Sequence, residues 1–232
     1  MDVKIWSDVR CPFCYIGKKK FEMALENFPQ KNKINIIWKS FQLDSSLKTN
    51  PDITAKEHFA EIKGISPDQV EGMYQHVENA AAEVKLKFNL EASVVANSFN
   101  AHRLIQFAKT KDLGNEIEEE LFKAQFIDCK NIDDLDRLAE IGISIGLEEK
   151  EVREILASDA FTKEVQTDEE EARSIGVSGV PFFVFDNKYA VSGAQSPETF
   201  LQTLNQVWQE AEKEKPVILS NGSTCTTAGT CD

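Results

Sequence analysis

Two cysteines close to the start of the chain constrain its fold more than any other feature. The sequence Cys11-Pro-Phe-Cys14 follows residues 3–7, whose side chains alternate as in a β-strand. Apolar residues then recur at helical spacing, at Cys14, Phe21, Leu25 and Phe28. Pro12 suits the first helical turn, because a helix start leaves that N–H unpaired anyway. The sequence therefore predicts a strand, a short loop and a helix that begins at the cysteine pair.

This placement gives the two cysteines different chemistry. Free N–H groups and the positive end of the helix dipole favour a thiolate at Cys11, and Arg10 adds a positive charge beside it. The thiolate is the reactive form, so Cys11 is the predicted nucleophile. Cys14 lies one turn further on, where it can attack a mixed disulfide at Cys11 and release the substrate. Pro12 and Phe13 carry no charge, so we expect them to act through packing and contact with the substrate.

Two other interpretations of the pair stay open. The cysteines can be buried apolar residues, or half of a zinc site that needs two more ligands, none of which lies nearby in the sequence. His58, His76 and His102 have no histidine partner at helical spacing, and we interpret each as a surface or internally satisfied residue. Cys129 is interpreted as a partly buried, unreactive thiol. We expect no resident metal ion and no organic cofactor.

The composition excludes several classes of protein. A length of 232 residues allows one core, or one domain that carries an insertion. The net charge of −13 argues against nucleic-acid and anionic-membrane partners. No apolar run reaches the roughly 18–20 residues of a membrane span, and the N-terminus lacks the apolar centre of a signal peptide, so a cytoplasmic protein is expected. The acidic clusters at 116–120 and 168–171 are interpreted as solvated helix faces.

Strand signals return near the other end of the chain. Phe182–Phe185 and Lys188–Val191 form a predicted hairpin, since Asp186 and Asn187 between them tolerate positive φ. Pro181 precedes the hairpin. A last helix follows, with Ser196 as its N-cap and Pro197 at its first position. The residues between the two strand regions, 50–175, have helical patterns, with capping boxes that begin at Thr54 and Ser66.

The order of these elements resembles the thioredoxin fold, with the helical insertion of its DsbA-like branch. Within that branch, "DVRCPFCYIGK", "NSFNAHRLI" and "GVSGVPFFVFDNKYAVSGAQ" are similar to FrnE-type proteins of the DsbA family. Phe13 departs from the pattern, since relatives commonly carry tryptophan there. The resemblance implies that Pro181 is a cis-proline that faces the cysteines, and that Val180 offers backbone groups to an extended substrate. It also implies that His102 supports the active site.

The predicted fold class is therefore α/β, a thioredoxin-like fold with a large inserted all-helical domain. Residues 1–48 and 176–212 would form the thioredoxin-like domain, and residues 49–175 the insertion. Residues 213–232 form a predicted flexible tail, in which Cys225 and Cys231 enclose five small residues. The tail pair is a second redox pair that exchanges electrons with Cys11 and Cys14, or part of a metal site, or without a role.

The leading functional hypothesis is a thiol–disulfide oxidoreductase that acts on protein or small-molecule thiols and disulfides. Its net direction can be oxidation, reduction or isomerisation, and glutathione is a possible co-substrate. A second hypothesis is a glutathione-dependent enzyme like hydroxychromene-carboxylate isomerase or the kappa-class transferases, although those typically carry serine at the position of Cys11. A third is a zinc-dependent or redox-regulated holdase. The oligomeric state is left open.

Overall fold

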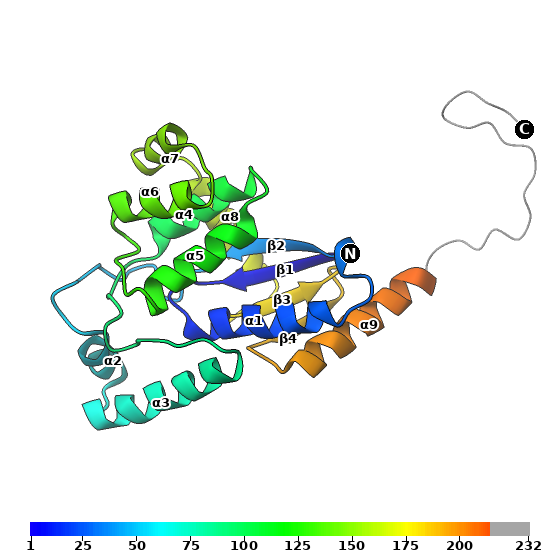
Figure 1. Ribbon diagram of the computed structural model, residues 1–232, viewed down its shortest axis with the longest axis horizontal. Coiled ribbons are helices and arrows are strands. Elements are labelled where there is room, and N and C mark those ends of the chain that lie inside the picture. Colours follow the sequence, from blue (N-terminus) through cyan, green and yellow to red (C-terminus); the bar gives the residue numbers. More distant parts are fainter. Residues whose placement is uncertain (214–232) are drawn as a thin grey trace, which may run out of the picture.

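A mixed four-stranded β-sheet forms the centre of the molecule. The computed structural model describes residues 1–213; the predicted tail pair, Cys225 and Cys231, lies outside the described residues. The strand order is β2-β1-β3-β4 (Figure 1). The strands are β1 (Asp2–Ser7), β2 (Asn35–Ser40), β3 (Phe182–Phe185) and β4 (Tyr189–Ser192). β1 is parallel to β2 and antiparallel to β3, so the first and last parts of the described chain meet in one sheet.

The predicted hairpin is confirmed, with its second strand shifted by one residue. β3 and β4 pair antiparallel, and the turn residues Asp186 and Asn187 have φ values of 51° and 55°. This left-handed conformation suits asparagine and aspartate better than most other side chains, because their short polar groups can bond locally. The turn therefore depends on the residue types that predicted it.

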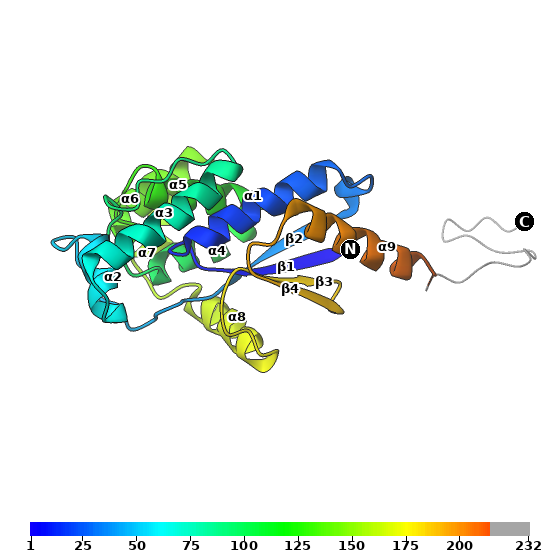
Figure 2. The ribbon, with the colours of Figure 1, turned by 90° about the horizontal axis from the view of Figure 1, so that it is seen from below.

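Helices cover both faces of the sheet (Figure 2). On one face lie α1 (Pro12–Glu26) and α9 (Pro197–Lys213), and on the other lies α8 (Thr162–Ser174). A short 3₁₀ turn, Lys31–Lys33, precedes β2. The remaining helices, all between β2 and β3 in the chain, are α2 (Ala55–Lys63), α3 (Pro67–Glu83), α4 (Phe99–Lys109), α5 (Gly114–Phe126), α6 (Leu135–Ser144) and α7 (Glu149–Leu156). Capping boxes at Thr54 and Ser66 start α2 and α3, as predicted.

Strand alternation divides the apolar residues between two cores. Val3 and Ile5 of β1 belong to the large core under α1 and α9, whereas Trp6 belongs to a small core with Ala172 and Val177 beside α8. Aromatic rings dominate the large core, where Phe21 of α1 lies 5.6 Å, centroid to centroid, from Phe183. This arrangement of α/β layers with helices inserted between β2 and β3 confirms the predicted fold class. None of the helices within residues 1–213 has the length and apolar character to cross a membrane.

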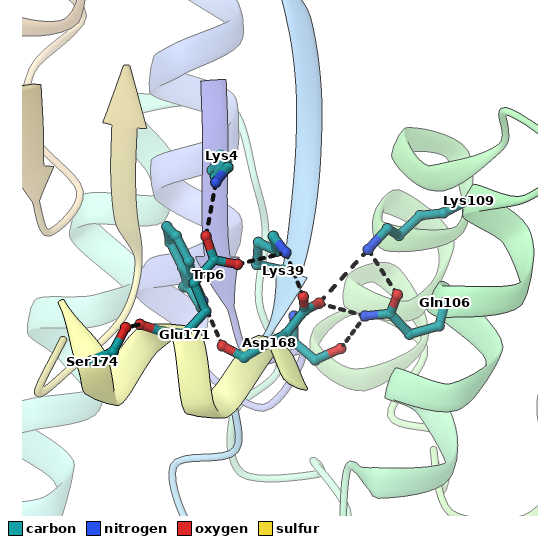
Figure 3. Close-up of polar contacts among 9 residues, drawn as sticks. Lys4, Trp6, Lys39, Gln106, Lys109, Asp168, Glu171 and Ser174 are labelled. Atoms are coloured by element: carbon teal, nitrogen blue, oxygen red, sulfur yellow. Dashed lines mark hydrogen bonds and ion pairs between the residues drawn. The ribbon is translucent and has the colours of Figure 1, made fainter. Parts of the chain in front are cut away.

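One acidic cluster that we interpreted as a solvated face is partly buried instead. The Asp168 carboxylate accepts hydrogen bonds from Lys39 Nζ at 2.6 Å and from Gln106 Nε2 at 2.6 Å, and Lys109 Nζ lies 3.7 Å away (Figure 3). The Trp6 indole donates to the backbone carbonyl of Asp168 at 3.0 Å. The expectation was wrong here because long-range partners from β1, β2 and α4 compensate for burial of the charge. Together these bonds hold α8 against the sheet.

Candidate active site

The cysteine pair lies where β1 passes into α1, as the sequence predicts. Cys11 is the N-cap residue of α1, with φ −94° and ψ 111°, and Pro12 occupies the first helical position. The Cys11 amide donates to the Asp8 carbonyl at 2.9 Å, which closes a tight turn before the helix. Cys11 keeps 7% of its surface exposed, against 1% for Cys14, and both are free thiols. The outer cysteine is thus the one that an incoming disulfide can reach.

The loop before β3 faces this helix start. The Cys11 thiol donates to the Val180 carbonyl at a sulfur–oxygen distance of 3.6 Å. The peptide bond between Val180 and Pro181 is cis, as the resemblance implied. Gly17, one turn beyond Cys14, permits this close approach, because a β-carbon there would lie 2.9 Å from Pro181 Cγ. The structure therefore brings the predicted residues Cys11, Cys14, Val180 and Pro181 together.

Cys14 is buried behind Cys11. Burial raises its pKa well above the ordinary value for a thiol, and the adjacent Cys11 raises it further. The Asp8 backbone amide and the Ser7 side chain act in the opposite direction on the same thiol. Cys14 is therefore a poor nucleophile until the site supplies donors for its thiolate.

Pro12 and Phe13, the residues between the cysteines, are half-buried. The Phe13 ring packs against the large core, and its centroid lies 6.2 Å from that of His76 on α3. His76 itself is exposed, while His58 on α2 is partly buried. The contact with Phe13 places α3 next to the redox pair, so a substrate bound at Phe13 would also lie close to α3.

A buried polar cluster lies behind the cysteines; the family resemblance implied a supporting role for His102, whereas Asp8 and Glu118 escaped the sequence analysis. Asp8 and His102 are both 0% exposed, and His102 Nε2 lies 3.5 Å from Asp8 Oδ1. Burial alone would raise the pKa of Asp8, but His102 and the amides of Leu43 and Arg10 lower it. For His102 burial lowers the pKa, and the facing carboxylate of Asp8 more than offsets this. Both directions favour the charged forms of Asp8 and His102, and His102 is buried and not a surface residue.

Glu118 of α5 completes this cluster. It is 1% exposed, its Oε2 has no hydrogen-bond partner among the described residues, and burial raises its pKa to about 7. The sequence placed Glu118 on a solvated helix face, which is wrong. Its neighbours Ile117 and Leu121 are buried too, and that apolar pattern was the available signal.

Other expected site residues lie elsewhere or act differently. The Arg10 amide donates to Asp8 Oδ1 at 3.1 Å. The pKa of Asp44 is lowered mainly by its hydrogen bond with Ser46, and the positive charge of Arg10 lowers it further. Cys129 is partly buried, as predicted, and burial raises its pKa. Within residues 1–213, no group of histidine, cysteine and acidic side chains is arranged to hold a metal ion.

Comparison with known proteins agrees with this geometry. The sequence matches the DSBA-like thioredoxin domain over residues 2–205. The chain belongs to this family. The crystal structure of the probable DsbA oxidoreductase SCO1869 from Streptomyces coelicolor is 34% identical in sequence, with a TM-score of 0.87 over 100% of this chain and 98% of that chain. The predicted DsbA-like family is thereby confirmed.

Two more distant relatives extend the comparison. The uncharacterized protein YwbO of Bacillus subtilis (strain 168) is 23% identical over 208 residues, which are 88% of this chain and 95% of YwbO. The cytosolic disulfide reductase DsbM from Pseudomonas aeruginosa is 14% identical, with a TM-score of 0.65 over 90% of this chain and 100% of that chain. At this identity the likeness to DsbM concerns the fold alone.

Proposed function

We propose that this protein is a thiol–disulfide oxidoreductase in which Cys11 is the nucleophile and Cys14 the resolving thiol. The observation that supports this most directly is the asymmetry of the pair. Cys11 is partly exposed at a helix N-terminus, 3.6 Å from the Val180 carbonyl, whereas Cys14 is buried with a raised pKa. An accessible sulfur that attacks and a buried sulfur that resolves is the division of labour that disulfide exchange needs.

The proposed reaction follows in two steps. The Cys11 thiolate attacks one sulfur of a substrate disulfide, and the other sulfur leaves as a thiolate that takes up a proton. Cys14 then loses its proton and attacks Cys11, so that the Cys11–Cys14 disulfide forms and the second substrate thiol is released. Two electrons pass from the cysteine pair to the substrate. The reverse sequence oxidises a dithiol, and interruption after the first step permits isomerisation.

The substrate lies, in this proposal, along the Val180–Pro181 loop. The Val180 backbone offers hydrogen-bonding groups to an extended chain, and Pro12, Phe13 and cis-Pro181 provide apolar contacts around Cys11. A protein or small-molecule thiol, glutathione included, regenerates the dithiol. The cytoplasm is the predicted compartment, and DsbM, which shares the fold, is itself described as cytosolic.

A trapping experiment tests the two roles. Cys14→Ser, incubated with a disulfide substrate, should accumulate a mixed disulfide at Cys11, identified by peptide mass mapping. Cys11→Ser should accumulate none, and Cys129→Ser should behave as the unsubstituted protein does. In glutathione buffers the pair should titrate reversibly at a potential between about −270 and −120 mV.

Two results would decide against this function. If Cys11 and Cys14 resist alkylation until a chelator strips a metal, they are ligands, as the zinc-dependent holdase would require. If Cys11→Ser keeps full activity as a glutathione-dependent isomerase, the cysteine is dispensable and the isomerase hypothesis takes its place.

A further inference from the structure

Ser7, the last residue of β1, has a buried hydroxyl without a partner. Ser7 is 1% exposed, and its Oγ makes no hydrogen bond within residues 1–213. Strand alternation places Ser7 on the same side of the sheet as Val3 and Ile5, the side that α1 covers. An unpaired buried hydroxyl is unfavourable by about 1–3 kcal/mol, so its presence calls for an explanation.

The candidate partner is Cys14, which is also 1% exposed and lies in the first turn of α1, the helix that covers this side of the sheet. Cys14 is buried on that helix, and the Ser7 hydroxyl and the Asp8 amide are the two groups that lower the pKa of its thiol. A thiol sulfur is a weak acceptor, whereas a thiolate accepts strongly. A Cys14 thiolate would therefore attract the unpaired Ser7 hydroxyl more strongly than the thiol does.

The Asp8 side chain holds this donor pair in place. Its Oδ2 accepts from the Leu43 amide at 2.8 Å and its Oδ1 from the Arg10 amide at 3.1 Å, which ties the turn before Cys11 to the segment after β2. His102 on α4 faces Oδ1 at 3.5 Å and supplies the compensating positive charge. Glu118 on α5 and Glu169 on α8 also act on His102. The Ser7–Asp8 segment is therefore fixed by three separate parts of the chain.

We propose that the Ser7 hydroxyl and the Asp8 amide form a donor pair for the Cys14 thiolate, and that the buried Asp8–His102 ion pair is its positioning device. The inference rests on the proposed function and concerns only the second step. When Cys14 attacks the Cys11 mixed disulfide, its S–H bond breaks and the new sulfur–sulfur bond forms. The proton lost from Cys14 ends on the departing substrate thiolate. The donor pair stabilises the charge on Cys14 during this step.

A two-phase measurement separates this inference from the function on which it rests. In full-length protein with Cys129, Cys225 and Cys231 changed to serine, Cys11 attacks dithiobis-nitrobenzoate and releases one coloured thiolate. Resolution by Cys14 then releases a second one. Ser7→Ala should leave the first phase unchanged and slow the second by about tenfold, because one hydrogen bond to a charged group is lost. The pH midpoint of the second phase should rise by about one unit.

Ser40→Ala is the matched control. Ser40 pairs with Ser7 in the sheet register and is equally buried at 1%, but its hydroxyl accepts a hydrogen bond from Gln106 on α4. His102→Gln should shift the pH midpoint of the second phase in the same direction as Ser7→Ala, since it removes a positive charge. If His102→Gln fails to fold, the Ser7→Ala measurement still tests the inference.

Each other outcome overturns the inference. An unchanged second phase in Ser7→Ala removes the hydroxyl from the mechanism. Equal slowing of both phases, or the same slowing in Ser40→Ala, shows a general effect on the core. If the unsubstituted protein lacks the first phase, the proposed function fails together with the inference.

Discussion

Two carboxylates, Asp8 after β1 and Asp168 on α8, are buried, and the protein surrounds them with different hydrogen-bond partners. The Asp168 carboxylate accepts hydrogen bonds from Lys39, the Ser40 amide and Gln106 (Figure 3). Asp8 has two backbone donors and the His102 contact, but polar atoms next to it lack hydrogen bonds within residues 1–213. These atoms are Ser7 Oγ, both ring nitrogens of His102 and Glu118 Oε2.

We interpret this difference as that between a structural anchor, the hydrogen-bonded network around Asp168, and the proposed reactive site. A fully hydrogen-bonded buried network has no free donor for a new charge, and breaking it leaves its buried partners without compensation for their desolvation. Unpaired donors and a carboxyl with a pKa of about 7 can respond when a neighbouring thiol ionises. The contrast therefore predicts that changes at Asp168 lower stability, whereas changes near Asp8 alter the chemistry and the pH dependence of activity or stability.

Asp168→Ala should have the largest effect on stability. It leaves Lys39, Gln106 and the Ser40 amide without their acceptor, and loss of one partner from a buried ion pair typically costs about 3–5 kcal/mol. Since Lys39 keeps partial exposure, we expect about 3 kcal/mol in the free energy of unfolding, measured by urea titration. The release of thiolate by Cys11 should stay normal in the folded fraction.

Asp136→Ala is the control for this prediction, because the Asp136 side chain is 84% exposed and pairs with Arg153 on the surface. It should change the free energy of unfolding by less than about 1 kcal/mol. If Asp168→Ala instead slows both phases of thiolate release in folded protein, the anchor also shapes the active site, and the contrast is wrong.

Glu118→Gln should change the pH dependence of stability. The folded protein raises the pKa of Glu118 from 4.5 to about 7, so protonation is favoured in the folded state. That contribution is fully present below the unfolded pKa and is lost as the pH rises through about 7. The glutamine variant should therefore be more stable at alkaline pH, by on the order of 2–3 kcal/mol, in urea titrations across this range.

The exposed neighbour Glu116 on the same helix provides the comparison variant, since Glu116→Gln should leave the pH profile of stability unchanged. A Glu118→Gln protein with the unaltered pH profile would mean that the carboxyl is already neutralised by a partner. The cluster behind Cys14 would then be as saturated as the one around Asp168.

Gly17→Ala tests whether the site is also loosely packed. A β-carbon would lie 2.9 Å from Pro181 Cγ and 3.5 Å from Ala194, so α1 or the Pro181 loop must move. Overpacking of this kind costs about 1–3 kcal/mol. We also expect a slower first phase of thiolate release, because the loop that faces Cys11 shifts.

Gly72→Ala is the matched variant, since a β-carbon there meets nothing within 4 Å. Replacing a glycine within α3 by alanine should stabilise the protein by up to about 1 kcal/mol. If both alanine variants gain stability equally, the Pro181 loop can move to accommodate the extra methyl group without loss of stability, and the contact between Gly17 and Pro181 is not tightly packed.

Local sequence patterns predicted the parts of this molecule that depend on neighbours in the chain. The cysteine pair at a helix start, the Asp186–Asn187 turn and both capping boxes each follow from a few adjacent residues. The placement of Pro181 opposite Cys11 followed from the family resemblance, because proline before a strand has several other uses.

The buried charges could not be predicted in the same way. Asp168 lies 128 residues from the Ser40 amide that binds it, and Asp8 lies far from His102 in the sequence. An acidic residue in a helical pattern is usually solvated, and only the tertiary structure shows which ones have donors. Glu118 and Asp168 were misplaced for this reason, while Glu116 and Glu170 in the same clusters are exposed as predicted.

Lys4→Met should have the smallest effect on stability, because Lys4 lies at the edge of the network around Asp168. Lys4 Nζ lies 2.8 Å from Glu171 Oε1, with side chains 23% and 31% exposed, and Glu171 keeps Lys39 as a second partner. Burial alone would raise the pKa of Glu171, but Lys39 and Lys4 lower it, so the pair's contribution is lost as the pH falls through that lowered pKa. We expect a loss of less than about 1 kcal/mol in the free energy of unfolding, measured by urea titration near neutral pH, and less still at high salt.

A loss of stability comparable to that of Asp168→Ala would show that the stabilising energy extends to the edge of the network. A small loss confines it to the Asp168 carboxylate itself, whose hydrogen bonds from Lys39, the Ser40 amide and Gln106 distinguish it from Asp8.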